Sequence, residues 1–373
     1  MHPLLRQKDH FIARDAVKER IERLTDNLIN ITDETGEFLL HLEDGRVIDT
    51  KGWAGWEWTH GIGLYGLLKY WELTGSEKAL SIIHEWFDAR LSEGTPTKNI
   101  NTVAPFLTLA SLYEHEPNPV WVPLMERWAD WVMYEMPRTR EGGLQHIVYN
   151  SVNDQQMWDD TLMMSVLPLA KIGLVLNKPE YVEEAKFQFL NHIQYLSDRE
   201  TGLWFHGWTF DGNHNFAKAL WARGNSWITI AIPEFIDMLD LQESDPICRH
   251  LLSTLRCQAE ALKDYQDEET GLWHTLINDR SSYLEASATA GFAYGLLKGV
   301  RKRYLPASFE PIAEKAIKGV INNINEEGEL LQVSFGTAMG TDLDFYREIA
   351  LTSMPYGQAM AMFCLSEYLR TYI

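Results

Sequence analysis

The sequence is short of the features that mark secreted, membrane-spanning and metal-binding proteins. Its three cysteines, Cys248, Cys257 and Cys364, are odd in number and follow no metal-ligand or redox spacing. They indicate buried free thiols in a reducing compartment. No apolar run reaches the roughly 18 residues that span a membrane, and the first ten residues lack the apolar core of a signal peptide. We therefore expect a cytoplasmic protein.

Positive charge is also scarce, with 33 Lys and Arg against 53 Asp and Glu and a formal net charge of −20. This balance argues against nucleic acid and anionic membranes as partners. A small acidic ligand could still be held by local Arg and His side chains. No linker, low-complexity tract or block of charge divides the chain, so we expect one domain over residues 1–373.

A short turn signature, acidic residues followed by Gly and then apolar or aromatic residues, recurs six times. Its spacing is too long for one helix and suits a pair of helices. Gly at such a position supplies the left-handed residue that ends a helix. The glycines of the six copies are Gly36, Gly94, Gly142, Gly202, Gly271 and Gly328.

Two kinds of helical segment alternate between these turns. One kind is amphipathic and charged, as in 16–31 and 248–265, which is typical of an outer helix with one wet face. The other kind is apolar and rich in Gly and Ala, as in 285–291, which suits a crowded interior. Six inner and six outer helices in alternation predict an all-α (α/α)6 barrel. An open solenoid of stacked helix pairs is the structural alternative.

The stretch from Gln156 to Met164 places two carboxylates, Asp159 and Asp160, directly before an apolar helix. One Asp could cap that helix, which leaves the second to be explained. Neighbours on a helix point about 100° apart, so these two residues cannot face each other as a pair. We predict that one of them serves the helix end and the other points into a cavity.

In the predicted barrel, the N-terminal ends of all inner helices face the same way, so the groups found there are neighbours in space. Most are aromatic, with a few carboxylates, His and Arg side chains among them. Aromatic rings stack on the apolar faces of sugars, and polar groups bind the hydroxyls. The pattern therefore predicts a sugar-binding cup. Its candidate residues are Trp58, His60, Asn101, His146, Trp158, Asp159, Asp160, His206, Trp208, Trp221, Arg223 and Trp227.

Two motifs in this set are fairly specific: Trp-x-Asp at 158–160 and Trp-Ala-Arg-x-x-x-Trp at 221–227. Weaker marks lie at 60–75, 142–146, 201–206, 284–287 and 335–337. With them, the chain resembles glycoside hydrolase family 105, the unsaturated rhamnogalacturonyl hydrolases, over nearly its whole length. It resembles the family 88 unsaturated glucuronyl hydrolases more distantly.

The resemblance implies roles for individual residues. Asp160 falls on the family's general acid and base, and the family's sugar-contacting His, Arg and Trp residues fall on His146, His206, Arg223 and Trp227. One position departs from the pattern, because the family's second active-site Asp falls on Asn101. Asn carries no charge, so that role is dispensable, altered or moved, for example to Asp159. Nothing in the sequence indicates a metal or a cofactor.

The implied substrate is a short oligosaccharide with a 4,5-unsaturated uronic acid at its non-reducing end, as arises in pectin degradation. Asp160 would protonate C4, and water added at C5 would give a hemiketal that opens and releases the remaining sugar. A general acid of this kind needs a raised pKa, which the apolar side chains of Trp158 and Met163 could supply.

Two alternatives stay open from the sequence. The first is another (α/α)6 enzyme, either an inverting glycosidase that uses Asp160 with Glu285 or a sugar epimerase that uses His146 and His206. The second is a non-enzymatic sugar-binding solenoid, in which the adjacent aspartates only cap a helix.

Overall fold

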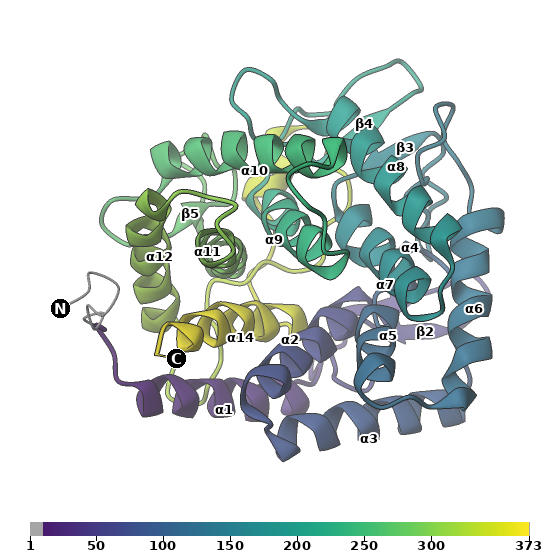
Figure 1. The fold of residues 1–373 in the computed structure, drawn as a ribbon, viewed down its shortest axis with the longest axis horizontal. Helices are drawn as coiled ribbons and strands as arrows, with labels where there is room; N and C mark the ends of the chain where they lie inside the picture. The colour runs from purple at the N-terminus through teal and green to yellow at the C-terminus, as the bar shows by residue number, and fades with distance from the viewer. Residues whose placement is uncertain (1–9, 373) are drawn as a thin grey trace.

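Two concentric rings of helices make up the computed structural model, which describes residues 10–372 (Figure 1). The helices of the inner ring are apolar and mostly buried on all sides. They are α2 (Trp58–Thr74), α5 (Phe106–His115), α7 (Leu167–Val175), α9 (Ala222–Met238), α11 (Ala286–Arg301) and α14 (Pro355–Leu369).

The outer ring consists of helices that bury one face and expose the other, as their alternation of apolar and charged residues predicts. Each outer helix precedes an inner helix in the chain, so the two rings are built together. The outer helices are α1 (Arg14–Asn30), α3 (Glu77–Glu93), α6 (Val122–Asp130), α8 (Pro179–Leu196), α10 (Pro246–Tyr265) and α12 (Glu310–Asn322).

The inner ring is closed. Going around it, α2 contacts α5, α5 contacts α7, α7 contacts α9, α9 contacts α11, and α11 contacts α14. The last inner helix, α14, packs against the first, α2, and against α1 (Figure 1). An open solenoid has no such contact between its ends, so this alternative is excluded. The prediction of an (α/α)6 barrel is confirmed.

Small residues let the inner helices approach closely. A Cβ atom on Gly66 of α2 would lie 2.9 Å from the Cβ of Ala359 on α14. Gly costs helix propensity, but at this position it allows two backbones to meet where the ring closes. The Gly- and Ala-rich composition of the inner segments therefore has a packing reason.

All six glycines of the repeated turn have positive φ, between 73° and 95°. Only Gly94 lies directly at a helix end, as the C-cap residue of α3. Elsewhere the outer helix stops earlier; α8 ends at Leu196, for example, whereas its turn glycine is Gly202. The prediction that each glycine ends a helix is therefore wrong for the other five turns.

Three of these glycines instead let the turn press against the next outer helix. A Cβ atom on Gly202 would meet the carbonyl oxygen of Cys257 in α10 at 2.7 Å, and one on Gly271 would meet that of Lys315 in α12 at 2.5 Å. One on Gly328 would meet that of Arg23 in α1 at 2.4 Å, so this turn joins the last outer helix to the first.

Short elements fill the connections between outer and inner helices. The helical ones are α4 (Ile100–Val103), α13 (Leu343–Arg347) and the π-helical turns Trp131–Glu135 and Leu162–Val166. The strands form three antiparallel pairs: β1 (Leu39–His41) with β2 (Val47–Asp49), β3 (Gln156–Trp158) with β4 (Gly207–Thr209), and β5 (Trp273–His274) with β6 (Leu284–Glu285).

The remaining predictions about composition have mixed outcomes. Within residues 10–372, no helix combines the length and apolarity needed to cross a membrane. All three cysteines are free thiols, but only Cys248 and Cys364 are buried. Cys257 is exposed, because it lies on the wet face of the outer helix α10.

Candidate active site

The pairing of β3 with β4 positions the two aspartates. Trp158 pairs with Gly207, and the ladder continues as the Asp159 N–H donates to the carbonyl of His206 at 3.0 Å. The chain then turns into the π-helical segment Leu162–Val166, which leads into α7. Two segments almost fifty residues apart in sequence, 156–160 and 206–209, are thereby fixed side by side.

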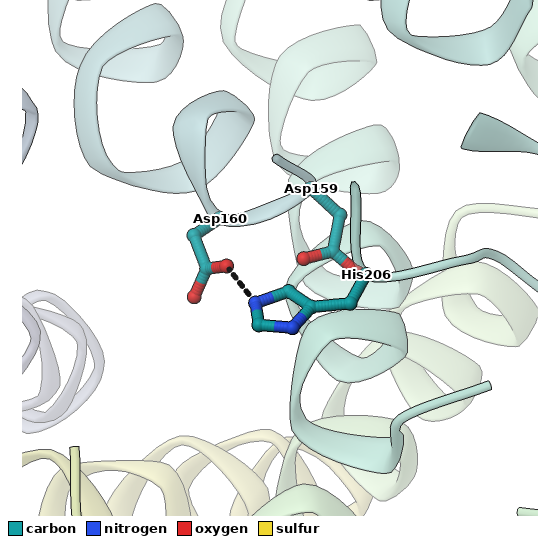
Figure 2. Close-up of side chains that lie close together, drawn as sticks. All are labelled: Asp159, Asp160 and His206. Atoms are coloured by element: carbon teal, nitrogen blue, oxygen red, sulfur yellow. Dashed lines mark ion pairs between the residues drawn. The ribbon is translucent and has the colours of Figure 1, made fainter. Parts of the chain in front are cut away.

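Asp160 and His206 face each other (Figure 2). Nε2 of His206 lies 3.2 Å from Oδ2 of Asp160. On the other side of the ring, Nδ1 of His206 lies 2.8 Å from the hydroxyl of Tyr346, which accepts the Gly340 N–H at 3.2 Å. The Tyr346 hydroxyl also donates to Sδ of Met339 at 3.6 Å, and its contact with Nδ1 holds the imidazole ring of His206 against Asp160.

The electrostatics of Asp160 differ from our expectation. Burial does raise its pKa, as predicted, but the apolar side chains that line the cavity with it are Trp158 and Met164 and not Met163. The contact with His206 and the charge of Arg223 act in the opposite direction and prevail, so the pKa of Asp160 lies below its ordinary value. In the ligand-free protein Asp160 is therefore ionised.

The pKa of Asp159 is shifted in the opposite direction. Its side chain is fully buried, and neither carboxylate oxygen is at hydrogen-bonding geometry with a donor among the described residues. Burial and the neighbouring charge of Asp160 raise its pKa well above the ordinary value. The helical turn begins at Asp160, so Asp159 stands at its N-terminal end, but neither carboxylate oxygen of Asp159 accepts a backbone N–H of this turn. The capping part of our prediction is wrong.

A cavity of about 510 Å³ opens beside Asp160. Half of the twelve candidate residues line it, and they come from four different parts of the ring. This gathering of inner-helix starts is the arrangement that the barrel pattern predicts. The six are Trp58, Asn101, His146, Trp158, Asp160 and Arg223.

The other six candidates do not line the cavity, and their contact with a ligand stays a prediction. Five of the six side chains are buried, and that of Trp208 is half-buried. His60, for instance, is fully buried, with Nε2 2.7 Å from the Gly52 carbonyl and Nδ1 accepting the Glu57 N–H. The six are His60, Asp159, His206, Trp208, Trp221 and Trp227.

His146 and Trp158 form one flat part of the wall. Their rings are stacked, with centroids 4.1 Å apart and an interplanar angle of 10°. Nδ1 of His146 lies 2.9 Å from the Thr161 hydroxyl, which fixes the ring. Burial lowers the pKa of His146 to about 3, so the imidazole is neutral over the physiological range.

Arg223 is a buried cation with neutral partners. Its Nη1 donates to the Ser334 and Phe335 carbonyls and to the Tyr356 hydroxyl at 2.7 to 3.0 Å, and its Nη2 donates to Thr337 at 2.6 Å. Its guanidinium also lies 4.3 Å from the centroid of the Trp221 ring. Within the described part of the chain, no carboxylate lies within ion-pair distance, so the alternative of an Arg223–carboxylate pair is excluded. Its positive charge faces the cavity unpaired.

The sequence pattern did not indicate several of the residues that line the cavity. Glu57 precedes Trp58 at the start of α2, where the aromatic pattern drew attention to its neighbours. Tyr149 and Phe216 lie in loops with no periodic signal, and the loop 335–341 reaches the cavity from the far end of the chain. Only Glu57 had a detectable signal, as a carboxylate at the start of an inner helix.

Asp159, Asp160 and His206 could together hold a metal ion. One ligand atom of each lies within 4.8 Å of the others, in the part of the chain that the structure describes. The positive charge of the nearby Arg223 disfavours a second cation there. A proton shared by Asp159, Asp160 and His206 would balance the same negative charges as a metal ion.

Comparison with known proteins identifies the family. The sequence profile of Glycosyl Hydrolase Family 88 matches residues 30–372. The chain belongs to this family. It is 30% identical over 319 residues to the unsaturated rhamnogalacturonyl hydrolase YesR of Bacillus subtilis, covering 85% of this chain and 90% of that protein.

Solved structures agree with this assignment and place the chain with family 105. A possible member of that family from Salmonella enterica is 65% identical, with a TM-score of 0.98, covering 100% of this chain and 98% of the other. Unsaturated glucuronyl hydrolase from Bacillus sp. GL1 shares the fold at 17% identity, with a TM-score of 0.67, covering 94% and 95%. The chain is thus a glycoside hydrolase of the 88 and 105 families.

Proposed function

We propose that the protein hydrates the C4=C5 double bond of a 4,5-unsaturated uronic acid at the non-reducing end of a short oligosaccharide. The observation that carries the proposal is the pairing of two groups in one cavity. Asp160 lies there 3.2 Å from His206, and Arg223 presents a guanidinium that has no carboxylate partner among the described residues. Names of the similar proteins, which include unsaturated rhamnogalacturonyl and glucuronyl hydrolases, support the same substrate class.

Arg223 supplies the local cation that an anionic substrate needs. The long-range field of a chain with net charge −20 opposes the binding of a uronate. A buried guanidinium can outweigh this field at short range, because its attraction is little screened by solvent. The stacked rings of His146 and Trp158 offer a flat surface for a sugar face.

In the proposed reaction, Asp160 acts twice. As a carboxylic acid it gives its proton to C4, and the positive charge that forms at C5 is shared with the ring oxygen. A water molecule attacks C5 while the Asp160 carboxylate takes a proton from it, which restores the acid. The hemiketal then opens at the bond between C5 and the ring oxygen, leaving a keto group at C5 and a hemiacetal at C1. The hemiacetal breaks down to an aldehyde and releases the rest of the oligosaccharide with its hydroxyl.

Asp160 is ionised in the free protein, so it must gain a proton when the substrate binds. The uronate brings a second negative charge into the cavity, which raises the pKa of a neighbouring carboxyl. The buried carboxyl of Asp159 holds a proton beside it, and two such adjacent groups titrate as a unit. We propose that substrate binding moves the shared proton toward Asp160.

Direct hydrolysis of the glycosidic bond is a second candidate, and one observation favours it. The cavity contains another carboxyl, Glu57, whose pKa burial raises to about 8. A protonated and an ionised carboxyl in one cavity are what an inverting glycosidase uses. Glu285 cannot take this part, because it is fully buried, accepts hydrogen bonds from Ser287 and Ser334, and does not line the cavity.

Ultraviolet absorbance of the unsaturated uronate separates the two reactions. Hydration at C5 destroys the conjugated chromophore, whereas direct hydrolysis and epimerisation leave it intact. We expect the absorbance of an unsaturated disaccharide to fall during turnover, in step with release of the second sugar. Sugar release with constant absorbance would favour direct hydrolysis. Absence of both changes over a panel of unsaturated disaccharides would overturn the proposed function.

The single domain and the cytoplasmic location that we predict stay proposals. We propose that residues 1–373 form one catalytic domain; residues 1–9 and 373 lie outside those that the structure describes. We also propose a cytoplasmic location, which the three free thiols support.

A further inference from the structure

Glu57 lies in the wall of the cavity, at the first turn of α2. Its Oε2 accepts the Trp58 N–H at 3.2 Å, and its own N–H donates to Nδ1 of His60 at 3.0 Å. The residue is only 3% exposed, and what exposure it has is to the cavity that Asp160 also lines. Capping explains the backbone contacts, but the residues that best cap a helix are Asn, Asp, Ser and Thr.

Two further polar groups lie on the same wall. The side chain of Asn101 lies beside the Glu57 carboxyl and acts to lower its pKa. The hydroxyl of Tyr149, whose pKa burial and the charge of Glu57 raise, is buried with no partner among the described residues. All three residues line the cavity. Buried hydroxyls nearly always have a hydrogen-bond partner, so the unpaired Tyr149 points to a ligand.

Glu285 stands at the equivalent position before another inner helix and has a purely structural role. It also precedes an inner helix and caps it, through the Ala288 N–H. It accepts further hydrogen bonds from the Ser287 hydroxyl and the Ser334 N–H, and it lies outside the cavity. Glu57 has fewer protein donors and an open side, which leaves part of its carboxyl for a ligand.

We propose that Glu57 is a further substrate-binding residue, which donates a hydrogen bond from its carboxylic acid to an oxygen of the bound uronic acid, beside Asn101 and Tyr149. This inference rests on the proposed function, since it assumes an anionic sugar in the cavity. A neutral acid can bind an oxygen atom of such a ligand without repelling its charge. Burial raises the pKa of Glu57 to about 8, so the acid form prevails at neutral pH.

The other groups around Glu57 keep their charge over the pH range in which it ionises. Burial lowers the pKa of His60 to about 4 and that of His146 to about 3, so both imidazoles are neutral above pH 6. Burial raises the pKa of the Tyr149 hydroxyl far above this range. The pKa of Asp160 lies below its ordinary value, and Arg223 is always a cation.

Equilibrium binding of an unsaturated disaccharide to the Asp160→Asn variant tests this role without turnover. With Glu57 present, Kd should rise above pH 8, approaching about tenfold per pH unit, because the ionised carboxylate repels the uronate and has lost its donor. In Asp160→Asn/Glu57→Gln, the amide still donates and cannot ionise. We expect a Kd raised a few-fold at pH 6 and then constant to pH 9.5.

Two variants serve as controls in the same background. Glu57→Asp keeps a carboxyl and the cap, so the alkaline rise in Kd should persist. Glu285→Gln changes the same residue type at an equivalent helix start outside the cavity, and the rise should persist there too. Thermal melting of each variant checks that it is folded.

The outcomes separate this inference from the proposed function. Wild-type protein that leaves the chromophore intact overturns the proposed function. Chromophore loss in the wild type, together with an alkaline rise in Kd that survives Glu57→Gln, overturns only the role of Glu57. If Glu57→Gln alone stops turnover with unchanged Kd, Glu57 transfers protons instead of binding substrate, and the inference also fails.

Discussion

The Nε2 atom of His206 lies 3.2 Å from Oδ2 of Asp160, and this contact gives two adjacent aspartates opposite protonation states. Asp160 lies against this imidazole and is ionised, whereas Asp159 is buried beside it without a donor and is protonated. The sequence places the two carboxyls one residue apart, but the histidine that distinguishes them arrives from another segment. Several testable consequences depend on this division.

The first concerns Asp160 itself. Asp160→Asn keeps the shape of the side chain but removes its ability to give and take a proton. We expect turnover to fall by at least the ~10²–10⁴-fold typical of a general acid–base group. Because Asp160 caps no helix, the melting temperature should change little. A variant that unfolds more easily but keeps its specific activity would contradict the catalytic role.

Arg223 should matter more for an acidic sugar than for a neutral one. Arg223→Met removes the charge at similar length, and we expect binding of the uronate to weaken by ~10–10²-fold, as for loss of a charged hydrogen bond. Binding of its methyl ester should weaken much less. Arg223→Lys is the control, because it keeps the charge but loses the contacts to residues 334–337. Equal losses for acid and ester in Arg223→Met would leave Arg223 only a structural role.

Asn101→Asp would place a second carboxyl beside Glu57. Two carboxyls in hydrogen-bonding contact share one proton, so the wall would carry a negative charge at neutral pH. We expect the KM for a uronate substrate to rise and the pH optimum to move to lower pH. Asn101→Ser adds no charge and should leave the optimum in place. An unchanged pH profile for Asn101→Asp would show that residue 101 does not contact the substrate region.

Glu57 also makes stability depend on pH. Its pKa in the folded protein, about 8, lies above the ordinary value of 4.5, so the folded state binds more protons than the unfolded state between these values. Stability contributed by the buried acid is complete below pH 4.5 and is lost as pH rises through 8, by at most about 5 kcal/mol at roughly 1.4 kcal/mol per unit. Denaturant unfolding at pH 5 and pH 9 should show Glu57→Gln losing less stability than the wild type over this range. Parallel losses in both proteins would contradict the raised pKa.

Gly224 is needed for the placement of Asp159. A Cβ atom at this position would lie 2.2 Å from Oδ2 of Asp159, whose side chain is fully buried. Gly224→Ala should therefore destabilise the fold by about 1–3 kcal/mol, the usual cost of overpacking a core. Gly336→Ala is the matched control, since its Cβ would find its nearest neighbour at 4.0 Å. Equal melting temperatures for both variants would show that Asp159 has room to shift.

The sequence determined much of the architecture by local rules. The inner helices over 58–74 and 286–301 follow from apolar segments rich in small residues, and the outer helices over 77–93 and 246–265 follow from amphipathic segments. The two kinds differ in sequence because a helix buried on all sides is apolar throughout, whereas a helix buried on one side is apolar only at the helical repeat. Their strict alternation predicts a double ring. The same rule predicts that the starts of inner helices meet, and six of the twelve candidate residues do line the cavity.

Only the tertiary structure decided which of these residues reach the cavity and what charge they carry. Closure of the ring brings Arg223 to Ser334, 111 residues away, and His206 to Tyr346, 140 residues away. Trp221 and Trp227 were equally good candidates by pattern, yet packing places them behind the wall. The protonation of Asp159, Asp160 and Glu57 depends on burial and on donors from distant segments, and a linear pattern carries no record of either.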